Sequence, residues 1–131
     1  MVLFMTQAME SKAELTPSCL LVADALLRLG EKWSILVVCN LRGGAQRFTV
    51  LKRNIPGISQ RMLTLALRGL ERDGLVLRTV HPTVPPRVDY ELTALGQSLV
   101  APIDALGAWA LSHQEEINAA RRAFDVRDGS P

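Results

Sequence analysis

The sequence predicts an α+β fold made mainly of helices. Ser59 is a residue type that caps a helix N-terminus, and Asp73-Gly74 can end that helix. Between them, apolar residues recur on one side of a helical wheel, Leu63, Ala66, Leu67 and Leu70, and polar residues on the other, Arg61, Thr64, Arg68 and Arg72. After Gly74 the pattern changes to two short extended runs around a proline-rich tip. A helix of this kind directly before a β-hairpin is typical of a winged helix-turn-helix.

The residues before Ser59 predict three further helices and a short strand. Apolar residues at helical spacing predict a helix over 17–29, and an almost wholly apolar run predicts a well-buried one over about 33–41. Residues 46–47 can form a stub of strand, and 48–54 a short third helix. Pro56-Gly57 then makes a tight turn, since proline restricts φ and glycine admits positive φ. A helix, a turn containing glycine and a second helix have the spacing of a helix-turn-helix.

The residues after Gly74 predict the wing and a C-terminal helix. Residues 76–80 are rich in β-branched side chains, and 88–92 alternate apolar with charged, so both runs predict strands of a two-stranded hairpin. Three prolines within 81–87 stiffen its tip. Thr93 can cap a long helix in which Pro102 introduces a kink or a division. We expect a partly ordered arm over 1–16, the winged domain with its terminal helices over 17–113, and a helix end with a flexible tail over 114–131.

Charge is unevenly distributed along the chain. The net charge is +2, but residues 42–92 hold nine Lys or Arg against four Asp or Glu. A basic centre between more acidic ends indicates a polyanion partner, although a solvated basic face is the simpler alternative. A hydrophobic content of 48% excludes a disordered chain. No run reaches the ~18 consecutive apolar residues of a membrane span, and no secretory leader is apparent, so we expect a cytoplasmic protein without a membrane partner.

Several short segments together resemble the HxlR-type family of bacterial winged-helix transcription regulators. The matching segments are Gly30-Glu31-Lys32-Trp33, Arg47-Phe48, Ile55-Pro56-Gly57-Ile58-Ser59-Gln60-Arg61-Met62-Leu63, Leu70-Glu71-Arg72-Asp73-Gly74-Leu75-Val76, and the wing residues 82–90 followed by Leu92-Thr93. The resemblance covers about residues 19–113. It implies a homodimer that binds an inverted-repeat operator in double-stranded DNA, with recognition helices in successive major grooves and wings beside the backbone.

The resemblance also implies dimerisation through the N- and C-terminal helices. The residues expected at that interface are Leu20, Leu99, Ile103, Leu106 and Trp109. Many members carry a cysteine before the first helix that senses oxidants, quinones or aldehydes. Cys19 occupies that place, fourteen residues before Trp33, but Leu20 stands where many relatives have proline. A helix N-terminus favours the reactive thiolate, so Cys19 is a candidate redox sensor, with an inert thiol at the dimer contact as the alternative.

Candidate DNA-binding residues lie on three segments. The first two turns of a recognition helix usually contact bases and phosphates. The candidates there are Ser59, Gln60, Arg61 and Thr64. Gln60 suits adenine and Arg61 suits guanine, while Arg68 suits a phosphate. Arg87, expected at the wing tip, suits the flanking backbone or a minor groove, and Lys32 suits a phosphate. The alternatives are a solvent-facing helix, an edge-strand charge at Arg87 and a surface lysine at Lys32.

Other functions find less support in the sequence. There is no Ser-His-Asp set, paired-carboxylate site, phosphate-cradling loop or metal cluster, so we expect no catalytic residue, metal or cofactor. Cys39 is expected in the core. A small-molecule ligand that binds between the helical layer and the winged domain is an alternative signal to oxidation. A winged helix that binds another protein is a different function altogether, but a protein-binding surface more often exposes aromatic or aliphatic anchors than an arginine stripe.

Overall fold

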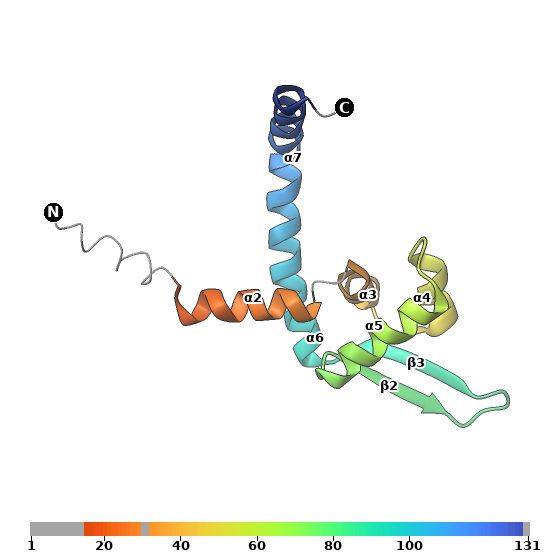
Figure 1. Ribbon diagram of the computed structural model, residues 1–131. Helices are drawn as coiled ribbons and strands as arrows, with labels where there is room; N and C mark the ends of the chain where they lie inside the picture. Colours follow the sequence, from red (N-terminus) through yellow and green to blue (C-terminus); the bar gives the residue numbers. More distant parts are fainter. Residues whose placement is uncertain (1–14, 30–31, 130–131) are drawn as a thin grey trace.

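The computed structural model describes residues 15–29 and 32–129, so most of the expected arm over 1–16 lies outside the described residues. Figure 1 shows a winged domain with one helix, α2, at its side and another, α7, projecting away from the wing. The elements in chain order are α2 (Pro17–Leu29), α3 (Lys32–Leu41), β1 (Gln46–Arg47), α4 (Phe48–Asn54), α5 (Gln60–Arg72), β2 (Val76–His81), β3 (Arg87–Leu92), α6 (Ala94–Ser98) and α7 (Val100–Asp128). The predicted α+β, mainly helical winged fold is confirmed.

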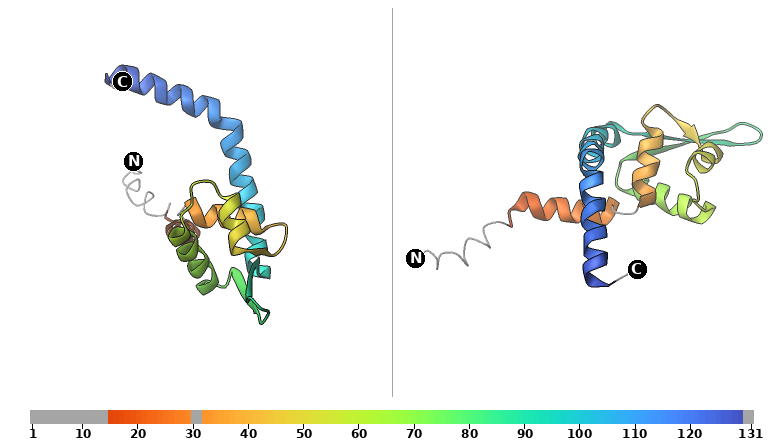
Figure 2. Two further views of the ribbon diagram at one scale, coloured as in Figure 1. Left: turned by 90° about the vertical axis from the view of Figure 1, so that its right-hand side faces the viewer. Right: turned by 90° about the horizontal axis from the view of Figure 1, so that it is seen from above.

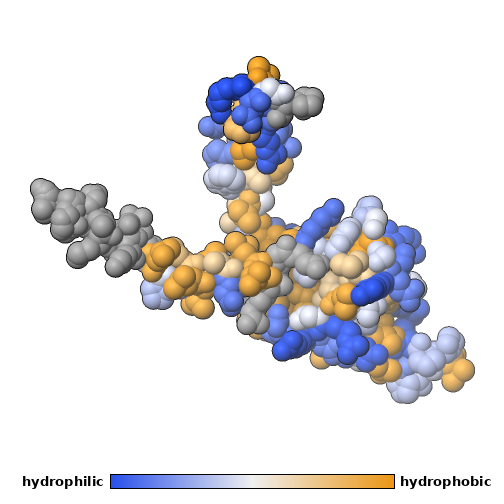
Figure 3. Space-filling view, viewed as in Figure 1, coloured by the Kyte–Doolittle hydropathy of each residue, from blue (hydrophilic) through white to orange (hydrophobic). Residues whose placement is uncertain are grey.

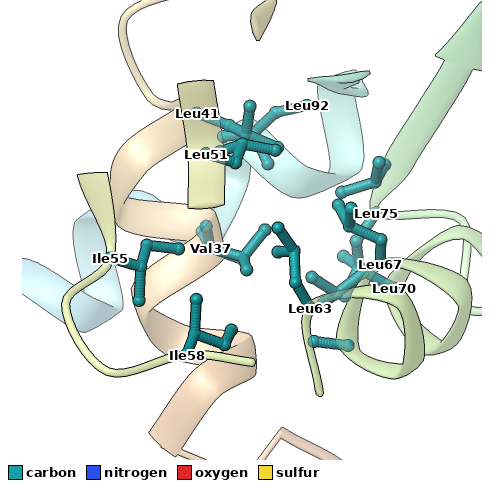
Figure 4. Close-up of a cluster of buried hydrophobic side chains, with 13 residues drawn as sticks. Val37, Leu41, Leu51, Ile55, Ile58, Leu63, Leu67, Leu70, Leu75 and Leu92 are labelled. Carbon is teal, nitrogen blue, oxygen red and sulfur yellow. The ribbon is translucent and has the colours of Figure 1, made fainter. Parts of the chain in front are cut away.

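The core lies where α3, α4, α5 and the base of the hairpin meet. It is built almost wholly from aliphatic side chains (Figure 4), which are Val37, Val38, Leu41, Leu51, Ile55, Ile58, Leu63, Ala66, Leu67, Leu70, Leu75, Val76 and Leu92. The apolar side predicted for the recognition helix is the side that α5 buries, mainly against α3. Each fully buried leucine or valine stabilises the fold by roughly 1.5–3 kcal/mol relative to exposure. Packing of α5 against α3 therefore determines which side of α5 faces outward.

The sheet has three antiparallel strands in the order β1-β3-β2, where a two-stranded wing was predicted. The hairpin of β2 and β3 is as expected, with Val76 opposite Leu92 and His81 opposite Arg87. The stub β1 adds a third strand, because Gln46 and Arg47 pair with Tyr90 and Asp89 of β3. Two residues are too few to show strand alternation, so the sequence could indicate β1 as extended but not its pairing.

Thr93 joins the wing to the C-terminal helices. Its hydroxyl accepts a hydrogen bond from the Gly96 amide (3.1 Å) and donates one to the Gly74 carbonyl (2.6 Å), so one side chain caps α6 and holds the end of α5. The run is divided into two helices, as one of the two alternatives predicted, but the break falls at Leu99 and not at Pro102. α6 ends at Ser98, and Pro102 stands in the first turn of α7, where a missing N–H breaks no helical bond.

The helix α7 is longer than we expected. It continues to Asp128 and ends at Gly129, whose positive φ of 76° suits a helix C-cap, so most of the expected tail over 114–131 is helical. The distal half is rich in alanine, glutamate and arginine, which favour helix. Figure 2 shows this part continuing well beyond the winged domain.

Both terminal helices expose apolar surface. Figure 3 shows apolar side chains over α2 and over the part of α7 nearest the domain. On α2 the exposed large side chains are Leu20, Leu21, Val22, Leu26 and Leu27. By length and composition alone, Ala94–Asp128 could cross a bilayer. One such helix is weak evidence for a membrane span, and a helix that packs against a partner also has this composition.

Candidate nucleic-acid interface

The recognition helix α5 begins as the sequence predicted. Ser59 has extended backbone angles, and its hydroxyl oxygen accepts a hydrogen bond from the Met62 amide at 3.0 Å. Gly57, with φ of 84°, makes the turn between α4 and α5. The helix ends at Asp73, followed by Gly74 with φ of 78°. The cap and the two glycines therefore define where α5 starts and where it stops, and its buried apolar side determines which side faces outward.

The outward side of α5 carries the predicted polar set. Ser59, Gln60, Arg61, Thr64, Arg68 and Arg72 are all exposed. The Thr64 hydroxyl donates to the Gln60 carbonyl at 2.9 Å, so its proton is used within the helix and its oxygen remains an acceptor. Leu65 is the one large apolar side chain exposed on α5. The surface is thus cationic and hydrogen-bonding, with little apolar anchor area.

Arg68 lies where α5 meets the sheet. It lines a cavity of about 370 Å³ together with Thr64, Glu71, Arg78 and Tyr90. Arg78 belongs to β2 and lies opposite Tyr90 of β3. The sequence analysis missed Arg78, although strand alternation already assigns it to the same face as Val76 and Val80. Two arginines from different elements therefore border this junction, and a phosphate could bind both.

Arg87 does not lie at the wing tip, where we had expected it. It is the first residue of β3, and the tip is formed by residues 82–86, with Val84 fully exposed. The Arg87 Nε atom is 3.6 Å from Asp89 Oδ2, too long for a hydrogen bond, and the same carboxylate oxygen is 3.0 Å from His81 Nε2. Cross-strand pairing of residues 81 and 87 aligns all three groups on one face of the sheet. Arg87 thus already forms an ion pair with Asp89 within the wing.

Arg47 is a second basic residue that sequence reasoning passed over. It immediately precedes α4 and, with Arg87, borders a cavity of about 490 Å³ between the wing loop and the start of α4. Arg47 is exposed, while Arg87 is half-buried. Pairing of Arg47 with Asp89 across β1 and β3 creates this neighbourhood, which explains why local sequence patterns did not indicate it.

Lys32 lies close to the start of the recognition helix. Its Nζ atom is 4.7 Å from the centroid of the Trp33 ring, a cation–π geometry. A Cβ atom added to Gly57 would lie 3.9 Å from Cη2 of the same ring, so Trp33 sits against the turn that leads into α5. The amino-terminal end of α3, which begins with the exposed Lys32, therefore lies near the turn that leads into α5.

Comparisons with known proteins agree with this arrangement. A family model described as HxlR-like helix-turn-helix matches residues 28–118. The chain belongs to this family. It is therefore a winged helix-turn-helix transcriptional regulator of the HxlR type, as the sequence resemblance implied.

Individual relatives extend the comparison. An uncharacterized HTH-type transcriptional regulator of Methanothermobacter thermautotrophicus is 50% identical over 97 residues, which covers 72% of this chain and 74% of the relative. The regulator YtcD of Bacillus subtilis is 46% identical over 85 residues, covering 65% and 68%. Among solved structures, the reduced redox regulator HypR has a TM-score of 0.69 at 39% identity, covering 75% of this chain and 97% of HypR. Reduced YodB of B. subtilis has a TM-score of 0.64 at 37% identity, covering 72% and 90%.

In this HxlR-type chain, Cys19 lies in the first turn of α2. Pro17 opens the helix, and the Cys19 amide donates to the Thr16 hydroxyl oxygen at 3.2 Å, so Thr16 acts as the cap. The side chain of Cys19 is exposed, whereas Cys39 is half-buried in α3. The predicted position at the start of the first helix is thus confirmed, and Cys19 stands on a helix separate from the α5 surface.

The residues predicted at a dimer interface fall into two groups. Leu20 on α2 and Leu106 and Trp109 on α7 are exposed, at 58%, 62% and 54%. Leu99 and Ile103 instead pack in part against the core of their own domain, because they lie at the root of α7. Of the five predicted residues, only Leu20, Leu106 and Trp109 are thus exposed apolar side chains.

Proposed function

We propose that two copies of this chain bind one inverted repeat in double-stranded DNA. The observation that carries the proposal is the outward side of α5, where cationic and hydrogen-bonding side chains stand directly beside the wing. A helix of this diameter fits the major groove, and a two-fold pair of recognition helices reads half-sites about one helical turn apart. Such a regulator acts on the chromosome, so we place it in the cytoplasm and assign it no catalytic role.

The residues have distinct roles in this proposal. Gln60 and Arg61, in the first turn of α5, face base edges, and Ser59 and Thr64 support that contact. Arg68, with Arg78 beside it, binds a phosphate, and Lys32 binds another next to the start of α5. Arg87, together with Arg47, faces the backbone beside the wing, provided that it can leave Asp89.

The salt dependence of binding tests this proposal. A site is first selected from random duplex DNA, and binding to it is then measured by fluorescence anisotropy at several salt concentrations. Because neutralised phosphates release counterions, affinity must fall steeply as salt rises. Selection of a palindrome together with a steep salt slope supports the proposal. Failure to select any duplex, or an almost flat salt slope, contradicts it and favours a protein-interaction module.

A second copy would cover the exposed apolar faces of α2 and α7. These faces include Leu20, Leu106 and Trp109, and a monomer would leave all of them in water. We therefore propose that the terminal helices form the dimer. Sedimentation measurements at micromolar concentration test this, with a monomer as the contradicting result.

We further propose that Cys19 is the site at which the regulator responds to oxidants or electrophiles. Its place in the first turn of α2, its exposure and the similarity to HypR and YodB, of which an oxidised and a diamide-treated form respectively are known, support the proposal. Oxidation by diamide joins Cys19 of one copy to Cys19 of the other in a disulfide and transfers two electrons and two protons to the diamide, which becomes a hydrazine. A change at α2 would then shift the dimer between conformations.

Replacement of Cys19 by serine separates oxidation from the alternative, a small ligand that binds without covalent chemistry. Wild-type protein should leave its operator after treatment with diamide or a quinone, and C19S should stay bound. C39S is the matched control, and it should respond like wild type. Unchanged release by C19S would contradict the role of Cys19 and favour a non-covalent ligand.

A further inference from the structure

One carboxylate in the wing is shared by two basic side chains. Asp89 Oδ2 lies 3.0 Å from His81 Nε2 and 3.6 Å from Arg87 Nε, and only the shorter contact is a hydrogen bond. The Asp89 side chain is 21% exposed, against 34% for His81 and 39% for Arg87. His81 and Arg87 therefore compete for one partly shielded oxygen atom, and His81 has the better contact with it.

The contact that holds Arg87 is weak. Its Nε–H group is buried, yet it finds no hydrogen-bond partner among the residues that the structure describes. An ion pair between partly exposed side chains, without a hydrogen bond, contributes little to stability. A DNA phosphate, in contrast, offers a guanidinium two parallel hydrogen bonds and a full negative charge. Arg87 therefore gains a better partner when it exchanges Asp89 for DNA.

Arg87 borders two hollows, which give its side chain room to move. One hollow, of about 360 Å³, is lined by Arg47, Arg87 and Asp89 together with Gln46 and Val50. The other is the cavity of about 490 Å³ beside the wing loop, and the same two arginines border it. A change of side-chain rotamer can therefore carry the guanidinium of Arg87 away from the carboxylate and toward the wing loop.

Strand register determines which other charges act on His81. Residues 47, 79 and 89 form one row across the three strands, and residues 81 and 87 belong to the adjacent row. On this face of the described sheet the other ionisable side chains are Arg47 of β1 and Arg87, Asp89 and Glu91 of β3. Phe48 and Thr49 of α4, which line the cavity beside the wing loop, are uncharged. Asp89 is thus the carboxylate in contact with His81, and Glu91 is the next one along the strand.

The charge of His81 decides how strongly Asp89 attracts Arg87. A carboxylate only accepts hydrogen bonds, so Nε2 of His81 carries a hydrogen in the neutral ring as well as in the imidazolium. Protonation therefore occurs at Nδ1, and it strengthens the existing bond because both partners are then charged. Histidine ordinarily changes charge between about pH 5 and 8. A charged His81 neutralises Asp89 and repels the Arg87 guanidinium, so the hold on Arg87 weakens.

We propose that Asp89 is a positioning residue that holds Arg87 away from DNA while His81 is neutral, and that protonation of His81 frees Arg87 for a backbone phosphate. This inference rests on the proposed function and adds control of the wing contact by pH. The DNA-bound state then favours the protonated form of His81. Because such coupling is reciprocal, the affinity for DNA must rise as pH falls through the range in which histidine takes up its proton.

Anisotropy titrations of the reduced full chain on its selected duplex, at about pH 8 and about pH 6, test this inference. Wild type should bind several-fold more tightly at the lower pH, with a salt slope steeper by about one because one more phosphate is neutralised. Asp89→Asn should already show the tighter binding and the steeper slope at the higher pH, since Arg87 is free. His81→Gln keeps an N–H donor for Asp89 but cannot take up a proton, so it should lose the response to pH.

Glu91→Gln is the matched control, because it removes a negative charge from the same face of β3. It should tighten binding less than Asp89→Asn and keep the response to pH. In an Arg87→Ala background, Asp89→Asn should bring no further gain, as expected if it acts through Arg87.

Two outcomes would overturn the inference and leave the proposed function intact. One is a chain that binds its inverted repeat with a steep salt slope but keeps its full pH response in His81→Gln, a variant that decides the matter even if Asp89→Asn fails to fold. The other is a gain from Asp89→Asn that persists without Arg87. A chain that selects no duplex at all overturns both the inference and the proposed function.

Discussion

Arg42 and Asp104 form a two-point ion pair between residues sixty-two positions apart. Arg42 Nη1 donates to Asp104 Oδ1 at 2.9 Å, and Nη2 donates to Oδ2 at 2.6 Å. Arg42 directly follows α3, and Asp104 stands near the start of α7. This pair connects α7 to α3, and α3 in turn packs against the recognition helix α5. One bidentate ion pair thus links the start of α7 to the end of α3.

The first prediction concerns the pH dependence of this pair. The hydrogen bond from Arg42 lowers the pKa of Asp104 below its ordinary value of 3.8. A lowered pKa in the folded state means that the stabilisation is present above the ordinary value and is lost as pH falls through the lowered one. Asp104→Asn should therefore lower Tm at neutral pH, and its difference from wild type should shrink in acid. Thermal melts followed by circular dichroism measure this, with Glu115→Gln as the control, and a difference that is constant with pH would contradict it.

The second prediction concerns Gly96, where α6 packs against the backbone of Leu75, the residue before β2. A Cβ atom there would collide with the backbone carbonyl oxygen of Leu75 and press on Leu92. Gly96→Ala should reduce the free energy of unfolding by about 1–3 kcal/mol through overpacking. Gly69→Ala is the matched control, since nothing lies within 4 Å of its Cβ position in α5. It should be stabilising by up to roughly 1 kcal/mol. Urea unfolding measures the free energy of unfolding of both variants, and equal changes in the two would contradict the prediction.

The third prediction concerns the cap of the recognition helix. Ser59→Ala removes the acceptor of the Met62 amide and should cost about 1 kcal/mol of unfolding free energy. Ser112→Ala on α7 removes a hydroxyl that bonds back to the Ala108 and Trp109 carbonyls of the same helix, and it should change stability by much less. Chemical denaturation of both variants provides the comparison. If Ser59→Ala proved as neutral as Ser112→Ala, the cap would contribute nothing measurable.

The fourth prediction separates base from phosphate contacts on α5. Arg61→Ala should cost roughly 1–3 kcal/mol on the selected operator and relax preference at one base pair. Arg68→Ala should weaken binding to all duplexes alike and reduce the salt slope by about one. Arg122, an exposed residue of α7, provides the control, and Arg122→Ala should leave DNA affinity unchanged. Anisotropy titrations on matched and mismatched sites test these outcomes, and identical behaviour of the two α5 variants would contradict the division of roles.

Much of the fold could be read from local patterns. Caps such as Ser59 and Thr93, turn residues such as Gly57 and apolar spacing within α5 act over a few residues, and each was predicted correctly. The candidate DNA surface on α5 followed from the same periodicity. Arg87 was misplaced because proline content shows that a tip exists but not where the second strand begins, which its pairing with His81 determines.

Local periodicity and capping along the chain predicted most of this protein's helices and its wing, and the segments that match the HxlR-type family indicated its family. The pairing of β1 with β3, the cavity that Arg68 and Arg78 both line and the Arg42–Asp104 contact appeared only in the folded molecule. The physical reason is distance along the chain. A helix is encoded by residues three or four apart, whereas these contacts join residues whose separation leaves no periodic trace, and packing of the shared core alone brings them together.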